Sequence, residues 1–161
     1  MPTRTKVGDA APDFALPSQT GELVNLKDLV GKKEIVLYFY PKDDSSGCTA
    51  EACAFRDSYA VFKERGAEVV GVSSDSIDSH KGFASRNSLP FILLSDVDGK
   101  VRKLYGASST FGLVPGRVTY IIDRRGMVRH IFSSQLNPKK HVEEALETLE
   151  KVQEVERGND Q

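Results

Sequence analysis

The stretch EIVLYFYPKDDSSGCTAEACAFRD (34–57) determines the fold that we predict. It begins with an apolar run of β-forming residues (35–40), which is typical of a strand buried on both faces of a sheet. Pro41 ends this run, and a short polar loop leads into a segment (49–65) in which apolar residues recur at helical spacing. The pattern predicts a buried strand, a loop and a helix, with Cys48 in the first turn of that helix.

The rest of the chain alternates between strand and helix signals, which glycine, proline and Asp-Gly turns separate. A small hairpin around PSQTG (17–21) and a short helix that ends at Gly31 precede the quoted stretch. Further strands are predicted at 68–74, 91–96, 117–123 and 127–134, and further helices at 78–88, 100–106 and 138–156. The last helix carries an apolar stripe, so we expect it to pack on the sheet.

This order of elements predicts an α/β fold. Two crossovers through helices imply parallel strands, and the last two strands, joined by DRRG (123–126), imply an antiparallel hairpin. A mixed β-sheet flanked by helices, with an N-terminal hairpin, suits a thioredoxin-like fold. No linker interrupts the chain, so we expect a single domain (1–161) with a frayed polar tail (155–161).

Composition and charge exclude several classes of protein. The 161 residues include 22 basic and 23 acidic side chains, a formal net charge of -1, which gives no reason to expect nucleic acid or an anionic membrane as a partner. The apolar runs are only as long as strands, and the N-terminus resembles neither a secretory signal nor a long transit peptide. We therefore expect a cytoplasmic protein, or one of the plastid stroma if a transit peptide has been removed.

The two cysteines, Cys48 and Cys53, are the candidate reactive groups. A helix N-terminus offers unpaired backbone N–H groups and a positive dipole end, and both stabilise a thiolate at Cys48. Gly47 lets the backbone approach a ligand closely, and Ser45 places a hydroxyl three residues before the sulfur. The alternative is that the cysteines are small buried apolar residues, and this alternative is stronger for Cys53.

A zinc site fits the sequence poorly, because two cysteines need two further ligands. The three histidines, His80, His130 and His141, lie in separate segments without the close spacing of metal ligands. We interpret them as surface or packing residues and predict no metal site.

The segment YPKDDSSGCTAEACAFRD (40–57) resembles the active-site segment of peroxiredoxins, specifically the peroxiredoxin Q (bacterioferritin comigratory protein) group. Pro41, Ser45 and Cys48 match the family pattern Pro-x-x-x-Thr/Ser-x-x-Cys. A second match is LVPGRVTYIID (113–123), where Arg117 falls on the family's active-site arginine. The resemblance extends over about residues 7–152.

The resemblance implies a thioredoxin-dependent peroxidase of the atypical 2-Cys type. Cys48 would be the peroxidatic cysteine, whose thiolate attacks hydrogen peroxide or an alkyl hydroperoxide and becomes a sulfenic acid. Ser45 and Arg117 would donate to the leaving oxygen, and Pro41 would form a wall of the pocket. Glu51 would orient Arg117, or it would be a first-turn acid favoured by the helix dipole. A solvated turn arginine is the corresponding alternative for Arg117.

Cys53 would then be the resolving cysteine, which closes an intramolecular disulfide with Cys48 that thioredoxin or a similar dithiol reopens. In an intact helix, residues five positions apart have Cα atoms roughly 8.6 Å apart. A disulfide tolerates a Cα separation of at most about 7 Å. The helix must therefore unwind locally before the two sulfurs can bond.

Two other functions stay open. A disulfide reductase of the thioredoxin type would carry C-x-x-C, whereas this chain has C-x-x-x-x-C. A non-enzymatic redox sensor or holdase on the same fold also needs a reactive thiolate, so Cys48 alone does not separate it from a peroxidase. The resemblance implies no organic cofactor and favours a monomer. It departs from the group at Ser46, where most members have a proline, and the lost constraint on φ predicts a looser loop.

Overall fold

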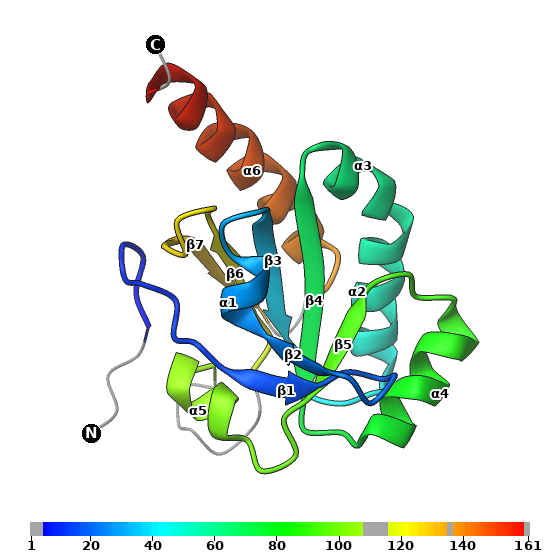
Figure 1. The fold of residues 1–161 in the computed structure, drawn as a ribbon. Helices are drawn as coiled ribbons and strands as arrows, with labels where there is room; N and C mark the ends of the chain where they lie inside the picture. The colour runs from blue at the N-terminus through cyan, green and yellow to red at the C-terminus, as the bar shows by residue number, and fades with distance from the viewer. Residues whose placement is uncertain (1–4, 108–115, 135–136, 160–161) are drawn as a thin grey trace.

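The computed structural model describes residues 5–107, 116–134 and 137–159. At its centre is a five-stranded sheet of order β5-β4-β3-β6-β7 (Figure 1). The strands are β3 (Glu34–Phe39), β4 (Ala67–Ser73), β5 (Ile92–Ser95), β6 (Val118–Ile122) and β7 (Val128–Ser133). β4 is parallel to β3 and β5, whereas β6 is antiparallel to β3 and β7. The predicted mixed α/β sheet of a thioredoxin-like fold is confirmed.

The N-terminal hairpin is also confirmed. β1 (Ala15–Pro17) and β2 (Leu23–Asn25) form a separate antiparallel pair, and α1 (Leu26–Leu29) follows directly. An isolated bridge between Ser18 and Leu94 connects the hairpin to the edge strand β5. Leu16 and Val24 of the hairpin pack against the core on one face of the five-stranded sheet, so the hairpin covers part of that face.

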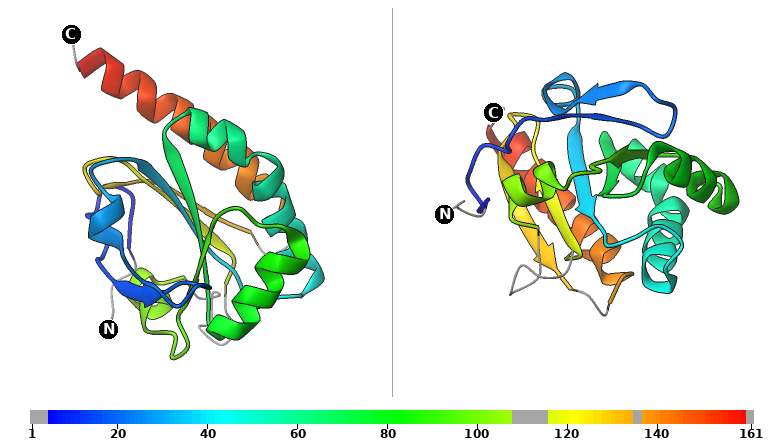
Figure 2. Two further views of the ribbon diagram at one scale, coloured as in Figure 1. Left: turned by 45° about the vertical axis from the view of Figure 1, so that its right-hand side comes forward. Right: turned by 90° about the horizontal axis from the view of Figure 1, so that it is seen from below.

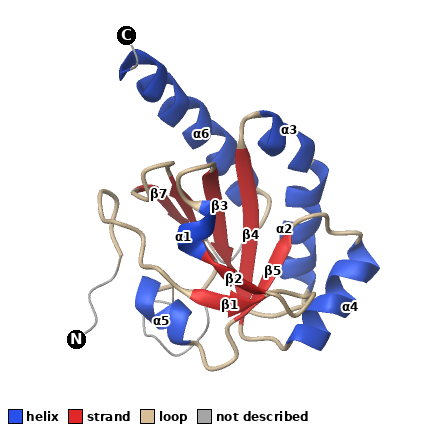
Figure 3. Ribbon diagram, in the orientation of Figure 1, coloured by secondary structure: helices blue, strands red, loops and turns tan. Residues whose placement is uncertain are grey.

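The sheet is covered on both faces (Figure 2 and Figure 3). One face packs against α2 (Ser46–Asp57), α3 (Tyr59–Glu64), α4 (Ile77–Asn87) and α6 (Lys140–Asn159), and the other against the hairpin, α1 and α5 (Lys100–Tyr105). Side chains of β3 alternate between these two cores, with Val36 and Tyr38 in the first and Ile35 and Leu37 in the second. Because β3 is buried along its whole length, the predicted strand with two covered faces is confirmed.

The prediction of one helix over 49–65 is wrong. The helix starts earlier, at Ser46, and breaks at Ser58, which ends α2 and precedes α3. Apolar periodicity continues through the break, because Phe55 of α2 and Phe62 of α3 are both fully buried in the same core. The change of direction at Ser58 keeps both rings against the sheet, and a hydrophobic pattern alone does not reveal such a break.

The other predicted elements are confirmed with small differences at their ends. α6 begins two residues later than predicted, because residues 137–140 form a turn in which the Lys140 N–H donates to the Asn137 carbonyl. The tail that we expected to fray is helical through Asn159, and residues 160 and 161 lie outside the described residues. In the described part of the chain, no helix is both long and apolar enough to cross a membrane.

The strand register brings distant segments together at the carboxyl end of the central strand β3. Phe39, the last residue of β3, pairs with Val118, the first residue of β6. Arg117 therefore lies beside the carboxyl end of β3, where the chain turns into the loop that leads to α2. Open α/β sheets bind ligands beyond the carboxyl ends of their strands.

Candidate active site

Cys48 occupies the N-terminal turn of α2. Ser45 is the N-cap residue, α2 begins at Ser46, and the first backbone bond of the helix runs from the Thr49 N–H to the Ser45 carbonyl. The N–H of Cys48 therefore belongs to the group that an α-helix leaves without an intrahelical partner. The side chain is 1% exposed. The sulfur thus lies at the positive end of the helix dipole and is shielded from bulk water.

Arg117, the residue before β6, lies against this turn. It is 5% exposed, so the alternative of a solvated turn arginine is wrong. Burial acts to lower the pKa of the guanidinium, but the nearby Glu51 and Cys48 side chains, with the hydrogen bond to Glu51, outweigh burial and raise this pKa. A Cβ atom on Gly47 would lie 2.9 Å from Arg117 Nη2. Glycine at position 47 therefore makes room for the guanidinium.

Glu51 contacts Arg117 directly. Arg117 Nη1 donates to Glu51 Oε1 at 2.8 Å, and the Glu51 side chain is fully buried. Its alternative interpretation as a first-turn acid is wrong, because Glu51 is the sixth residue of α2 and that turn contains no acidic residue. The contact is the one that an orienting role for Glu51 requires, and the role itself stays a prediction.

His141 of α6 lies near the second carboxyl oxygen of Glu51, the one that Arg117 does not bond. Its Nδ1 lies 3.6 Å from Glu51 Oε2 and 2.7 Å from Thr119 Oγ1, and its Nε2 lies 2.9 Å from the Ser134 carbonyl. Burial lowers the pKa of His141 to about 4, so the ring is neutral at pH 7. Nε2–H then donates to Ser134, and Nδ1 accepts from the Thr119 hydroxyl.

The buried carboxyl of Glu51 predicts a pH-dependent stability. Burial raises its pKa from 4.5 to about 8, against the opposing charge of Arg117. Between these values the folded protein keeps a proton that the unfolded chain has released, so the free energy of unfolding falls as the pH rises. His141, with its lowered pKa, has the opposite effect only below pH 6.5. From pH 6.5 to 8 we expect a loss of about 2 kcal/mol from Glu51.

Urea unfolding at several pH values checks this expectation, with Glu51→Gln as the comparison. Glutamine keeps an acceptor for Arg117 and does not titrate. The stability of the variant is expected to change less than that of the wild-type protein over this range. Parallel stability curves for the two proteins would show that Glu51 does not titrate there.

Ser45 and Pro41 flank the loop before α2, but neither side chain is tied to Cys48 by a hydrogen bond. The Ser45 hydroxyl donates to the Lys42 carbonyl at 3.0 Å and does not cap the helix. Pro41 follows the buried end of β3 and is half-buried. Ser46, which stands where the group usually has a proline, is the first residue of the helix. Proline is favoured at this position, so serine makes the start of α2 easier to unwind.

Cys53 lies in the middle of the same helix as Cys48. Both thiols are free, and the helix is continuous from Ser46 to Asp57. Cys53 is half-buried and lines a hollow of about 570 Å³ between α2 and α6. The hollow is also lined by Ala50, Ala54, Asp57, Ser58, Lys139, Val142, Glu143 and Leu146. The arrangement keeps the two sulfurs unbonded as long as α2 stays helical.

Arg102 was not among the residues predicted from the sequence. It is 5% exposed, and its guanidinium donates to the carbonyls of Tyr40, Ala107 and Gly116 at 2.5, 2.7 and 2.7 Å. These carbonyls belong to the segments that follow β3 and α5 and that precede Arg117. Arg102 thus joins the backbone around the site. In the sequence it stands in a basic helix, where nothing distinguishes it from a surface arginine.

A second buried polar cluster, also missed, holds the loop before α2. Asp43 accepts hydrogen bonds from His80 Nδ1 at 2.7 Å and from the Tyr40 hydroxyl at 2.6 Å, and its N–H donates to Asp75 Oδ2 at 2.8 Å. Burial acts to raise the pKa of Asp43, but these side-chain bonds outweigh burial and lower it. One atom from each of Asp43, Asp75 and His80 could serve as a metal ligand, and these three atoms lie within 4.8 Å of one another. Neither cysteine belongs to this group.

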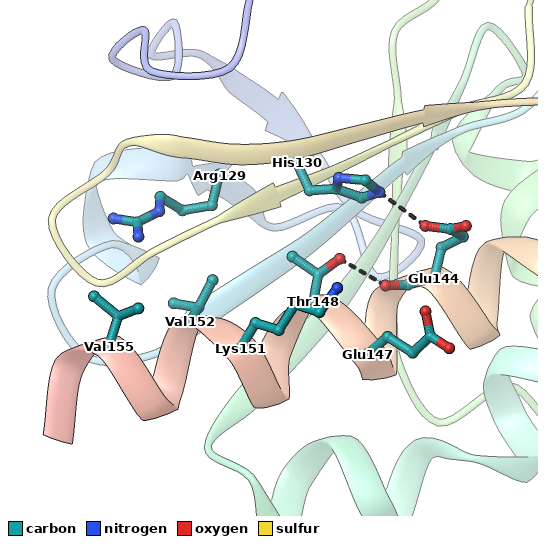
Figure 4. A pocket seen from close by; sticks show the side chains of 8 residues that line it. All are labelled: Arg129, His130, Glu144, Glu147, Thr148, Lys151, Val152 and Val155. Atoms are coloured by element: carbon teal, nitrogen blue, oxygen red, sulfur yellow. Dashed lines mark hydrogen bonds and ion pairs between the residues drawn. The ribbon is translucent and has the colours of Figure 1, made fainter. Parts of the chain in front are cut away.

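A hollow on the other side of α6 is separate from this site. It has a volume of about 220 Å³ and lies between β7 and α6, where His130 Nε2 pairs with Glu144 Oε2 at 2.9 Å (Figure 4). Its lining contains neither Cys48 nor Arg117. This hollow therefore lies outside the candidate active site at the N-terminus of α2.

Comparisons with known proteins identify the family of the chain. The chain matches the AhpC/TSA family over residues 7–131. It is 50% identical over 146 residues to "Peroxiredoxin Q, chloroplastic" of Sedum lineare, a match that covers 90% of this chain and 78% of the relative. The corresponding protein of Arabidopsis thaliana is 53% identical over 143 residues, which cover 88% of this chain and 66% of the relative.

Two solved structures are similar over nearly the whole chain. The crystal structure of peroxidoxin BcpB from Mycobacterium tuberculosis has a TM-score of 0.86 and 37% identity, and the match covers 92% of this chain and 99% of the other. The bacterioferritin comigratory protein of Xanthomonas campestris, a structure that addresses alkyl peroxide reduction, has a TM-score of 0.81 and 27% identity. That match covers 91% of this chain and 96% of the other.

Proposed function

This chain belongs to the AhpC/TSA family and, within it, to the peroxiredoxin Q group of thiol peroxidases, and from that premise we propose that Cys48 reduces hydrogen peroxide and alkyl hydroperoxides. The observation that supports this assignment most is the position of the Arg117 guanidinium against the first turns of α2, where it bonds Glu51 and lies beside Gly47, the residue before Cys48. A buried guanidinium and a helix N-terminus both favour a thiolate and stabilise negative charge that develops beside it.

The first step transfers oxygen to sulfur. The Cys48 thiolate attacks one peroxide oxygen, the O–O bond breaks, and the other oxygen leaves as hydroxide or alkoxide, which takes up a proton. Arg117 donates toward the reacting oxygens, Glu51 orients Arg117, and Pro41 walls the pocket. Ser45 contributes only after its hydroxyl turns from the Lys42 carbonyl toward the substrate.

In the second step, Cys53 converts the Cys48 sulfenic acid to an intramolecular disulfide. Its sulfur attacks the Cys48 sulfenic acid, an S–S bond forms, and the hydroxyl group leaves as water. Because an intact helix holds the two Cα atoms roughly 8.6 Å apart, the first turns of α2 unwind before this step. A dithiol reductant such as thioredoxin then reduces the disulfide by thiol–disulfide exchange.

Other features of the proposal rest on the group alone. We place the protein in the cytoplasm or the plastid stroma, and the chloroplastic relatives favour the stroma. A monomer that forms a single domain over 1–161 stays a prediction.

The experiment that tests this function follows peroxide and cysteine oxidation together. Wild-type protein with a thioredoxin system is expected to consume many equivalents of peroxide. After one equivalent without reductant, mass spectrometry is expected to show an intramolecular Cys48–Cys53 bridge. A sensor would instead oxidise once and stop, and a disulfide reductase would not consume peroxide.

The Cys53→Ser variant isolates the second step. It is expected to react once with peroxide, to retain Cys48 as a sulfenic acid, to over-oxidise readily and to lose most thioredoxin-driven turnover. If the main wild-type product is a stable sulfenic acid or an intermolecular dimer, Cys53 is not the resolving cysteine. The protein would then be a one-cysteine enzyme.

A further inference from the structure

The C-terminus of α4 lies against α2 beside Cys53. α4 ends at Asn87, and Ser88 follows in the left-handed conformation at φ 52°, so the helix cannot continue. The carbonyl of Asn87 accepts a hydrogen bond from Arg56 Nη1 at 2.8 Å. A cation is favoured at a helix C-terminus, where carbonyls lack intrahelical donors. Arg56, three residues after Cys53, thus joins this part of α2 to the end of α4.

The side chain of Asn87 makes a second connection to the same part of α2. Its Nδ2 donates to the Phe83 carbonyl, one turn earlier in α4, at 3.0 Å. This bond determines which end of the amide faces α2. Oδ1 accordingly lies 3.7 Å from Cys53 Sγ, and the thiol donates to it. The Asn87 amide has a fixed orientation, because it bonds the backbone of Phe83 and the side chain of Phe83 is fully buried in the core.

We propose that Asn87 is a positioning residue for the resolving step, which holds the Cys53 thiol protonated and turned toward α4 until α2 unwinds. The inference rests on the proposed function, in which Cys53 attacks the Cys48 sulfenic acid. In that step the thiol loses its proton, a new S–S bond forms, and the proton leaves with the hydroxyl group as water. A hydrogen bond donated by the thiol stabilises its neutral form, so this bond must break before Cys53 attacks.

The parts of α2 that contain Cys48 and Cys53 are held by different contacts. The segment with Cys53 is tied to α4 through Arg56 and Asn87. The segment with Cys48 begins at Ser46 without a side-chain cap. Unwinding of the N-terminal turns also separates Glu51 from Arg117, and release of Cys53 from Asn87 is the further step that limits disulfide formation.

Two substitutions at position 87 are expected to act in opposite directions. Asn87→Ala removes the acceptor and leaves the backbone carbonyl that Arg56 binds, so disulfide formation is expected to become about two- to fivefold faster. Asn87→Asp places a carboxylate beside the thiol, which strengthens the hydrogen bond and disfavours the thiolate, so disulfide formation is expected to slow by a similar factor. Neither change should alter the reaction of Cys48 with peroxide.

The measurement is a quenched time course after one equivalent of peroxide, in which mass spectrometry separates sulfenic acid from disulfide. The pH dependence of Cys53 alkylation in the reduced protein is a second readout, and it is expected to shift down in the alanine variant and up in the aspartate variant. Ser85→Ala, an exposed position on the same helix, is the matched control and should behave like the wild type.

Each outcome decides the inference. If both Asn87 variants form the disulfide faster, Asn87 acts only by stabilising the packing of α2. If neither variant changes the rate or the alkylation profile, Asn87 has no positioning role. If wild-type protein forms no Cys48–Cys53 bridge, the proposed resolving step fails first and this inference fails with it. A bridge that forms at a rate unaffected by position 87 overturns only the inference.

Discussion

The Cys48→Ser variant is expected to show no measurable peroxide turnover. A serine hydroxyl at this position is not ionised near pH 7, and the helix N-terminus and Arg117 do not lower its pKa far enough to change this. Without a thiolate there is no nucleophile to take oxygen from the peroxide. Peroxide consumption coupled to a thioredoxin system measures the loss directly.

The matched control for this experiment is Cys53→Ser, which makes the same chemical change in the same helix. That variant should still consume one equivalent of peroxide, whereas Cys48→Ser should consume none. Serine is close to cysteine in size, so the buried position should remain filled, and urea unfolding checks that the variant is folded. Substantial turnover without Cys48 would overturn its assignment as the peroxidatic cysteine.

Local patterns predicted most of the fold because burial and turn chemistry act over short distances. The apolar run of β3 and the punctuation by Pro41 placed the central strand and the loop correctly, whereas α2 starts three residues before the predicted helix. The break at Ser58 was missed, since Phe55 and Phe62 keep helical spacing across it and both reach the same core. A change in helix direction that preserves the apolar face leaves no trace in the periodicity.

The site was predictable only in part, because its members come together through strand pairing. Cys48 follows from local sequence, but the approach of Arg117 depends on the register of β3 with β6, and only the family resemblance joined the two in advance. Asp43, His80 and Arg102 were missed for the same reason. Each is a charged or polar residue whose partners lie in distant segments, so its burial is visible only in the folded chain.

Arg117→Met is expected to slow the reaction of Cys48 with peroxide by about 10²–10³-fold. Methionine keeps much of the side-chain length and removes the guanidinium donors that lie beside the first turns of α2. The loss should appear in the second-order rate constant for peroxide, because the guanidinium acts on negative charge that develops as the O–O bond breaks. Arg117→Lys restores a charge without the planar fork of donors, so it should recover only part of the rate.

The effect on stability should be smaller than the effect on rate, and Glu51 is the reason. Removal of one partner of a buried ion pair normally leaves an uncompensated charge. Because the pKa of Glu51 is raised to about 8, its carboxyl is largely protonated at pH 7, and loss of Arg117 leaves mainly an unmade hydrogen bond. Urea unfolding at pH 7 is therefore expected to show a decrease of about 1–3 kcal/mol.

Arg129→Met is the matched control, since Arg129 forms a half-exposed pair with Asp123 at 3.3 Å on β7, away from Cys48. It should leave peroxide reactivity unchanged. If Arg117→Met also reacts with peroxide within a few-fold of the wild type, Arg117 is a structural residue that packs Glu51 and Gly47 and takes no part in the chemistry. A large loss of rate with a stably folded protein would instead establish that the guanidinium acts on the reacting oxygens.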